Sequence, residues 1–93
     1  MWVILEHRRA TRSLQKLPIE ILKRYEKWKD IVALSGPVGL KLIKGFHDEA
    51  LSGERKGQRS SRLGDKYRVI YEVDGAEIRI LVMDVTPHDY RSK

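Results

Sequence analysis

Apolar and polar residues alternate with a period of two in the last third of the chain. In Tyr67–Val73 and again in Ile78–Val82, every second residue is apolar, and Asp74-Gly75 lies between the two runs. This alternation is typical of a strand with one buried face, and Asp-Gly is a strong hairpin signal. The pattern therefore predicts an antiparallel hairpin that buries Val69, Tyr71 and Ile80.

The register of this hairpin depends on the length of its loop. A two-residue loop would place Glu72 opposite Glu77, whereas a four-residue loop, 74–77, would place Glu72 opposite Arg79. Like charges directly opposite each other destabilise a sheet. We therefore expect the four-residue loop.

A second turn lies upstream, in "RLGDKYR". If Gly64–Lys66 forms a tight turn, Leu63 lies opposite Tyr67 and Arg62 lies opposite Arg68. Opposed arginines repel each other, which suggests that an anionic ligand belongs between them. The alternative is that these are ordinary solvent-facing positions paired with Glu72 or Asp84, and for Arg79 we favour that alternative.

The first half of the chain has helical spacing. "MWVILEH" predicts a first strand, Ala10, Leu14 and Leu17 predict a short helix, and a second helix is expected from Pro18 to Leu34. The apolar stripe of the second helix is Ile21, Leu22, Tyr25, Trp28 and Val32. Ser35–Pro37 should end it.

Residues 38–58 have no sustained period and are predicted to form a loop with one helical turn. Its apolar residues, expected to lie under the sheet edge, are Leu40, Leu42, Ile43, Phe46 and Leu51. The whole chain, 1–93, then forms one α+β domain. It has an N-terminal strand and a two-helix hairpin on one face of a mostly antiparallel four-stranded sheet.

Composition adds a hint about partners. The 93 residues contain no cysteine, and 19 Lys and Arg against 13 Asp and Glu give a net charge of +6. The apolar start ends at Glu6, too short for a membrane span, so we expect a cytoplasmic protein without a membrane partner. A basic excess suits a polyanion such as nucleic acid, an acidic protein, or both in turn.

The positive charge concentrates in Gly53–Arg68, where six basic residues face two acids. The six are Arg55, Lys56, Arg59, Arg62, Lys66 and Arg68. Arginine binds phosphate oxygens in pairs and keeps its charge. The sheet face with Arg62, Arg68 and Arg79 is therefore a candidate seat for a phosphate backbone.

The chain ends in a cluster of groups able to transfer protons. His88, Asp89, Tyr90 and Arg91 follow Pro87 within "TPHDYRSK". Histidine titrates near neutral pH. No nucleophile motif or phosphate-cradling glycine loop is present, and the scattered His7, His47 and His88 favour neither a metal nor a cofactor, although Asp48 and Glu49 beside His47 leave a metal there as a minor alternative.

Taken together, the sequence resembles the RelE/ParE toxin superfamily of type II toxin–antitoxin systems. "HRRATRSLQKLP" is similar to the first-helix segment of the family. "RLGDKYRVIYEVDGAEIRILVMDV" resembles its most recognisable stretch, and "HDYR" resembles the catalytic tail of the ribosome-dependent members. The resemblance implies a fold like that of microbial RNases.

The resemblance also implies site residues. Arg62 and Arg68 match the arginines on either side of the Gly-Asp turn, and His88 and Tyr90 match tail positions that carry acid–base groups. Asp89 resembles part of the Asp-Tyr pair of the HigB branch, and His47 is similar to a loop histidine of some branches. Arg55, Lys56, Arg59, Lys66, Arg79 and Arg91 are the remaining candidates for RNA binding. Ser60 stands where many members have a further arginine.

The implied activity is ribosome-dependent cleavage of mRNA without a metal, with the ribosome and a cognate antitoxin as partners. Two alternatives stay open. One is a non-catalytic poison of DNA gyrase, which would have no need of His88 and Tyr90. The other is a degenerate member that only binds an antitoxin.

Overall fold

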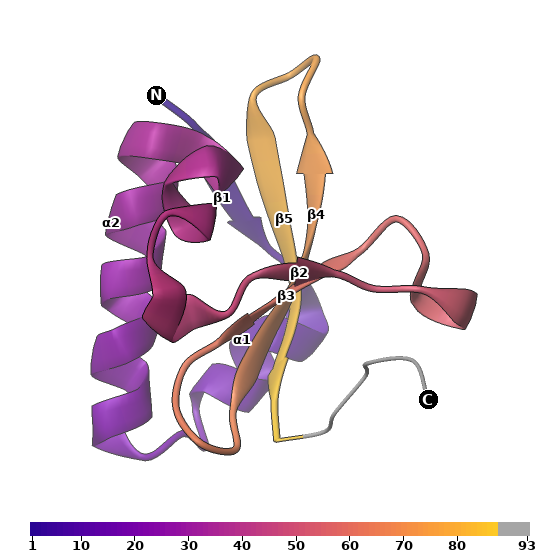
Figure 1. Cartoon of the computed structure of the whole chain (residues 1–93). Coiled ribbons are helices and arrows are strands. Elements are labelled where there is room, and N and C mark those ends of the chain that lie inside the picture. The colour runs from indigo at the N-terminus through magenta and orange to yellow at the C-terminus, as the bar shows by residue number, and fades with distance from the viewer. Residues whose placement is uncertain (88–93) are drawn as a thin grey trace.

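A computed structural model of the protein describes residues 1–87. The elements run in the order β1 (Val3–Glu6), α1 (Arg8–Leu14), α2 (Ile19–Lys41), η1 (Lys44–Phe46), β2 (Glu49–Ala50), η2 (Gly53–Arg55), β3 (Arg59–Arg62), β4 (Arg68–Asp74) and β5 (Arg79–Thr86). The strands form a single sheet in the order β1-β5-β4-β3-β2, with α2 packed along one face (Figure 1). The predicted α+β class and two-helix arrangement are confirmed.

The sheet is mixed. β1 runs parallel to β5, with Ile4 opposite Ile80, whereas the other neighbouring pairs are antiparallel. It has five strands instead of the expected four, because Glu49–Ala50 pairs with the start of β3. This two-residue strand lies inside the segment predicted as a loop. It is too short to leave a periodic signal in the sequence.

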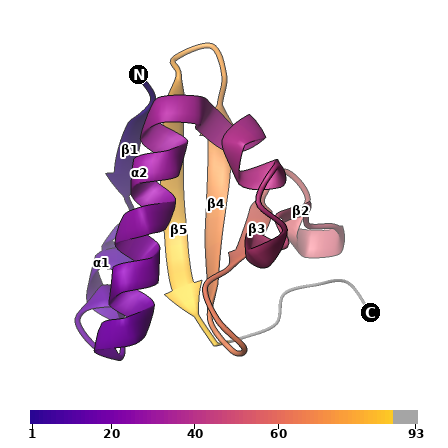
Figure 2. The same cartoon turned by 60° about the vertical axis from the view of Figure 1, so that its left-hand side comes forward.

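The core lies between α2 and the sheet (Figure 2). Trp28 is fully buried at its centre, with its ring 5.8 Å from that of Tyr25 in a stack and 5.3 Å from that of Tyr71 edge-on. Such aromatic pairs contribute about 0.5–1.5 kcal/mol beyond the burial of their area. The predicted stripe is confirmed for Tyr25, Trp28 and Val32, while Ile21 and Leu22 are half-buried at its margin.

The long helix α2 is bent at Gly36. This residue has φ 67 and ψ −168, which is non-helical, and Pro37 follows it. A Cβ at Gly36 would lie 2.5 Å from the indole nitrogen of Trp2, so both the backbone conformation and the close approach of Trp2 require glycine. The predicted stop at Ser35–Pro37 is therefore a kink, after which the helix resumes as far as Lys41.

The segment after the kink differs from its prediction in part. Leu40, Phe46 and Leu51 are buried as expected, but Leu42 is 80% exposed and Ile43 is 38% exposed. These last two follow the resumed helix and are not among the hydrophobic residues packed against the core cluster. Across residues 1–87, no helix is long and apolar enough to cross a bilayer.

The β4–β5 hairpin has a loop of the predicted length, displaced by one residue. Asp74 lies opposite Arg79, so the loop is 75–78, and Glu72 lies opposite Leu81 instead of Arg79. The displacement has a local cause, since Asp74 accepts a hydrogen bond from the Glu77 backbone N–H and pairs with Arg79 at 3.2 Å. Closer to the core, an irregularity between Ile70 and Tyr71 shifts the register once more, so that Ile70 faces Asp84.

Candidate functional site

Three strands meet in one cross-sheet row at the end of the sheet farthest from the β4–β5 loop. Arg62 of β3 lies opposite Arg68 of β4, and Arg68 lies opposite Thr86 of β5. The opposition of the two arginines was predicted from the sequence and is confirmed. Their neighbours Leu63 and Val69 face the core, so alternation assigns both arginines to the other face of the sheet.

The row is also the place where the chain leaves the sheet. β5 ends at Thr86, directly beside Arg68, and only Pro87 separates Thr86 from His88 in sequence. The predicted tail residues His88, Asp89, Tyr90 and Arg91 lie outside the described residues. Their roles stay predictions.

Arg68 is more enclosed than a solvent-facing position would be. It is 6% exposed, and Ser60 and Ile70 beside it on the same face are buried as well. Of the two carboxylates considered as ion-pair partners, Glu72 also accepts from the Gln58 amide at 2.9 Å, and Asp84 also accepts from the Ser13 hydroxyl at 2.8 Å.

Arg59 lies in a cluster that the sequence analysis missed. Its Nε and Nη2 donate to one carboxylate oxygen of Asp48, at 3.0 and 2.7 Å. The other oxygen accepts from Ser61 at 2.7 Å and from the Tyr71 hydroxyl at 2.5 Å. The Asp48 side chain has no exposure, and this buried cluster joins the segment before β2 to β3 and β4.

The cluster perturbs its tyrosine. Burial raises the pKa of Tyr71 well above its usual range, and the hydrogen bond to Asp48 raises it further. Tyr71 is therefore held as a neutral donor. Because Arg59 is already paired, less of its charge is available to a phosphate than for an unpaired arginine.

The other predicted RNA-binding residues are dispersed. Arg55 donates to Gln58 at 3.2 Å, which extends the Gln58–Glu72 contact into a short chain. Lys56 and Lys66 are exposed, at η2 and at the β3–β4 turn. Arg79 forms an ion pair with Asp74, far from the row of Arg62 and Arg68. An ion pair was the alternative that we favoured for Arg79, but its partner is Asp74 and not Glu72 or Asp84.

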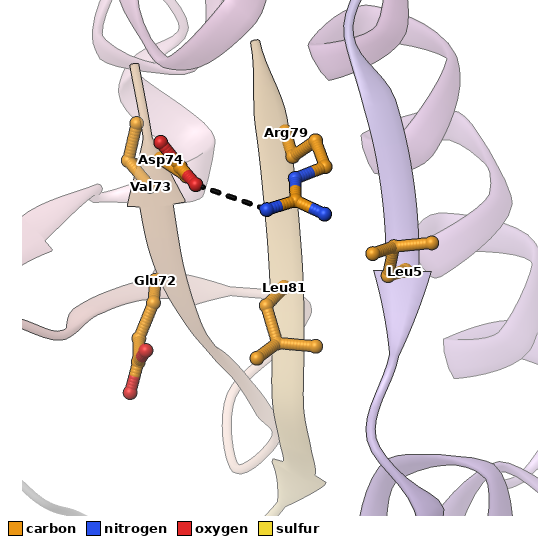
Figure 3. A pocket seen from close by; sticks show the side chains of 6 residues that line it. All are labelled: Leu5, Glu72, Val73, Asp74, Arg79 and Leu81. Carbon is orange, nitrogen blue, oxygen red and sulfur yellow. Dashed lines mark hydrogen bonds and ion pairs between the residues drawn. The ribbon is translucent and has the colours of Figure 1, made fainter. Parts of the chain in front are cut away.

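A hollow of about 230 Å³ opens on the same uncovered face, nearer the β4–β5 loop (Figure 3). Leu5, Leu81 and Glu72 form one cross-sheet row in its floor. Asp74 and Arg79 close its end through their ion pair. Leu5 escaped the sequence analysis, because nothing local indicates that β1 lies beside β5.

The described residues include two histidines, His7 and His47. His7 caps α1, with its Nδ1 accepting from the Arg9 N–H at 3.0 Å. His47 has a left-handed backbone, φ 43, and its Nε2 lies 3.9 Å from a Glu49 oxygen. No group of three potential metal ligands occurs among the described residues.

Comparisons with known proteins identify solved structures that have a similar fold. No protein-family model and no curated protein matches the chain. Among solved structures, the archaeal RelE–RelB complex from Pyrococcus horikoshii matches with a TM-score of 0.72 at 27% identity, over 92% of this chain and 93% of that chain. The RelBE2 toxin–antitoxin complex from Mycobacterium tuberculosis matches with a TM-score of 0.66 at 24% identity, over 91% and 95%.

The chain has the fold of the toxins of the RelE/ParE superfamily. A third match shows how far the fold persists without sequence likeness: YafQ from E. coli has a TM-score of 0.76 at 11% identity, over 92% of each chain. In this RelE/ParE-like fold, Arg62 and Arg68, the arginines that the resemblance singled out, share one row of the sheet. Arg59 departs from a simple basic surface because Asp48 holds it.

Proposed function

We propose that this protein is the toxin of a type II toxin–antitoxin module and a ribosome-dependent mRNA endonuclease of the cytoplasm. The observation that carries the proposal is the row Arg62–Arg68–Thr86. It brings two phosphate-binding side chains to the strand position from which the tail with His88 and Tyr90 continues. The net charge of +6 supports an anionic substrate.

The proposed reaction uses only protein side chains. A base in the tail removes the proton of an RNA 2′-hydroxyl, and the resulting oxygen attacks the adjacent phosphorus. The bond to the 5′-oxygen breaks, an acid in the tail protonates that oxygen, and the product is a 2′,3′-cyclic phosphate. His88 and Tyr90 are the two proton-transfer groups, each contributing about a hundred- to ten-thousandfold.

Arg62 and Arg68 act on the charge of the phosphate. As the 2′-oxygen attacks, negative charge grows on the non-bridging oxygens, and guanidinium groups aimed at them stabilise it. Without a phosphate the two arginines repel each other across the β3–β4 ladder. The repulsion is relieved when the phosphate binds between them, which favours binding at this row.

A cognate antitoxin is the proposed protein partner. The matched structures from Pyrococcus horikoshii and Mycobacterium tuberculosis are complexes of a toxin with its antitoxin. The sheet face opposite α2 carries Arg62 and Arg68 at one end and the apolar Leu5 and Leu81 nearer the other. An acidic, amphipathic antitoxin segment across this face would cover the proposed site.

The test is cleavage of a defined mRNA on programmed ribosomes. We expect cuts within the codon of the decoding site, 2′,3′-cyclic phosphate ends, and none on free mRNA at the same concentration. In cells, protein synthesis should stop before plasmid supercoiling changes. Loss of supercoiling first, with intact mRNA, would instead establish the gyrase poison, and neither effect would leave only the antitoxin-binding module.

A further inference from the structure

A second hollow, of about 410 Å³, lies between α2, η1 and the turn that joins β3 to β4. Its volume is within the range of small-molecule sites. Arg68 and Ile70, on the sheet face opposite α2, are not among the residues that line it. No part of the proposed cleavage mechanism uses it except Arg62, which lies at the junction of the two regions.

The hollow is strongly positive. Arg24 and Lys27 contribute from α2 and Arg62 from β3, against a single carboxylate, Asp65, so three cations less one anion leave a local charge of +2. Like charges that converge on one hollow are destabilising unless an anion joins them. A ligand of two negative charges would balance this set.

The guanidinium of Arg24 is fixed in advance. Its Nη1 donates to the backbone carbonyl of Leu63 at 3.0 Å. The turn allows this because Gly64 has no side chain: a Cβ there would lie 3.3 Å from Arg24 Nη1. A guanidinium already held by one bond loses little freedom when its remaining N–H groups bind a ligand.

Arg62 provides a donor that lacks an acceptor. Its Nε is buried and makes no hydrogen bond within residues 1–87. Buried donors are nearly always satisfied, by protein, water or a ligand. An acceptor bound in the adjoining hollow would satisfy it.

The floor of the hollow is apolar. Leu63 and Phe46 are buried in the core, while Ile43 remains 38% exposed at the edge. Ile43, which the sequence analysis expected to be buried, is therefore an exposed apolar side chain in the lining. A planar apolar group of the ligand would cover it.

We propose that this hollow binds a nucleotide, with its phosphate among Arg24, Lys27 and Arg62 and its base against Ile43. The planar, doubly donating guanidinium suits phosphate better than carboxylate. The phosphate has two sources: a free nucleoside monophosphate, or one link of an RNA strand that continues past the sheet edge. The assignment goes beyond the proposed cleavage reaction, with which it shares only Arg62, and its test does not use cleavage.

The test is a titration of the ¹⁵N-labelled protein followed by NMR. The probes are uridine 5′-monophosphate, inorganic phosphate, and a DNA oligonucleotide whose ends carry no phosphate. We expect the amides of Gly45 and Gly64, which line the hollow, to shift with the monophosphate, and inorganic phosphate to bind at least about tenfold more weakly. Shifts with the oligonucleotide identify an RNA strand as the source, and shifts with the monophosphate alone identify a free nucleotide.

The variant is Lys27→Gln, because the Lys27 side chain is exposed. It should weaken nucleotide binding about tenfold. Lys23→Gln, exposed on the same helix but outside the hollow, is the matched control and should bind like the parent protein. Chemical shifts remote from the hollow report that both variants fold.

The proposal fails if none of the nucleotide probes shifts Gly45 and Gly64, or if Lys23→Gln weakens binding as much as Lys27→Gln. Equal affinity for inorganic phosphate and uridine monophosphate would show that the base makes no contact in the hollow, and it would overturn the proposal of a nucleotide site. An acidic peptide that shifts the same amides, where nucleotides do not, would reassign the hollow to a protein partner.

Discussion

Asp48 and Arg59 form an ion pair with two hydrogen bonds, and its carboxylate is fully buried. Ser61 and Tyr71 complete the set, so that four donor groups satisfy one carboxylate. A buried charge is tolerated only when it is paired and hydrogen-bonded in this way. The cluster is therefore expected to hold the segment before β2 on the sheet.

Asp48→Ala should lower the free energy of unfolding by about 3 kcal/mol, because it leaves Arg59 and two hydroxyl groups without their acceptor. Urea denaturation measures the change. Asp65→Ala, at an exposed position in the β3–β4 turn, is the control and should change stability by less than about 0.5 kcal/mol. A loss of under 1 kcal/mol for Asp48→Ala would mean that the cluster contributes little to folding.

Two buried tyrosines predict a loss of stability in alkali. Burial, together with Asp48, raises the pKa of Tyr71, and burial, together with Glu6, raises the pKa of Tyr25. Above the usual tyrosine pKa of about 10, the unfolded chain loses these protons while the folded protein keeps them, so stability falls as pH rises. Below pH 10 this contribution is fully present.

The measurement is urea denaturation from pH 8 to 11, with tyrosinate absorbance recorded in parallel. Tyr71→Phe and Tyr25→Phe should each be less stable at pH 8 and should each show a shallower decline above pH 10. Parallel curves for the parent and both variants would show that neither hydroxyl is protected in the folded protein.

Replacing His88 or Tyr90 with Ala should abolish toxicity and lower cleavage on programmed ribosomes at least about a hundredfold. The thermal midpoint should stay unchanged, because residues 1–87 already form a buried core cluster between α2 and the sheet. Cell growth on induction and the cleavage assay measure the effect. Full toxicity of both variants would remove the tail from the mechanism.

Arg62→Gln should reduce cleavage about a hundredfold, since one donor to the developing charge is lost. It should leave the free energy of unfolding equal or slightly higher, because a repelling partner of Arg68 is removed. Thermal denaturation and single-turnover cleavage separate the two effects. A marked loss of stability with normal cleavage would make Arg62 a structural residue.

Binding of a non-cleavable RNA should depend steeply on salt. The cations expected to meet phosphates are Arg55, Lys56, Arg62 and Arg68, and Arg59 is left out because Asp48 balances its charge. At roughly −0.7 per phosphate on a single strand, the slope of log affinity against log salt should be about −3. Lys56→Gln should reduce its magnitude by about 0.7, and Lys41→Gln, on the helix side, should not. An unchanged slope in Lys56→Gln would mean that these basic residues are ordinary protein surface and do not bind phosphates.

Local patterns were enough to predict the arginine row. The Gly64–Lys66 turn lies between Arg62 and Arg68 in sequence, so their opposition follows from one short hairpin. The α2 stripe was equally legible, because Tyr25, Trp28 and Val32 repeat at helical spacing toward one large core. Both features involve residues within about ten positions of each other.

The parts that were missed depend on distant contacts. Asp48 lies in an aperiodic segment, and its partners Arg59, Ser61 and Tyr71 reach it only after β2, β3 and β4 have paired. The hairpin register was displaced by a side-chain contact of Asp74 that residue periodicity does not encode. The exposure of Leu42 follows from the kink at Gly36, which returns the chain to a helix where a loop was expected.

The parallel pairing of β1 with β5 has a consequence for how the protein folds during its synthesis. Val3 pairs with Arg79, so β1 can pair with β5 only after 79 − 3 = 76 further residues have been synthesised. β5 lies between β1 and β4 in the sheet. Until β5 has been synthesised, β1 and β4 therefore each lack their shared neighbour. Loop closure over such a distance is slow and entropically costly. The sheet can therefore become continuous only after β5 has been synthesised.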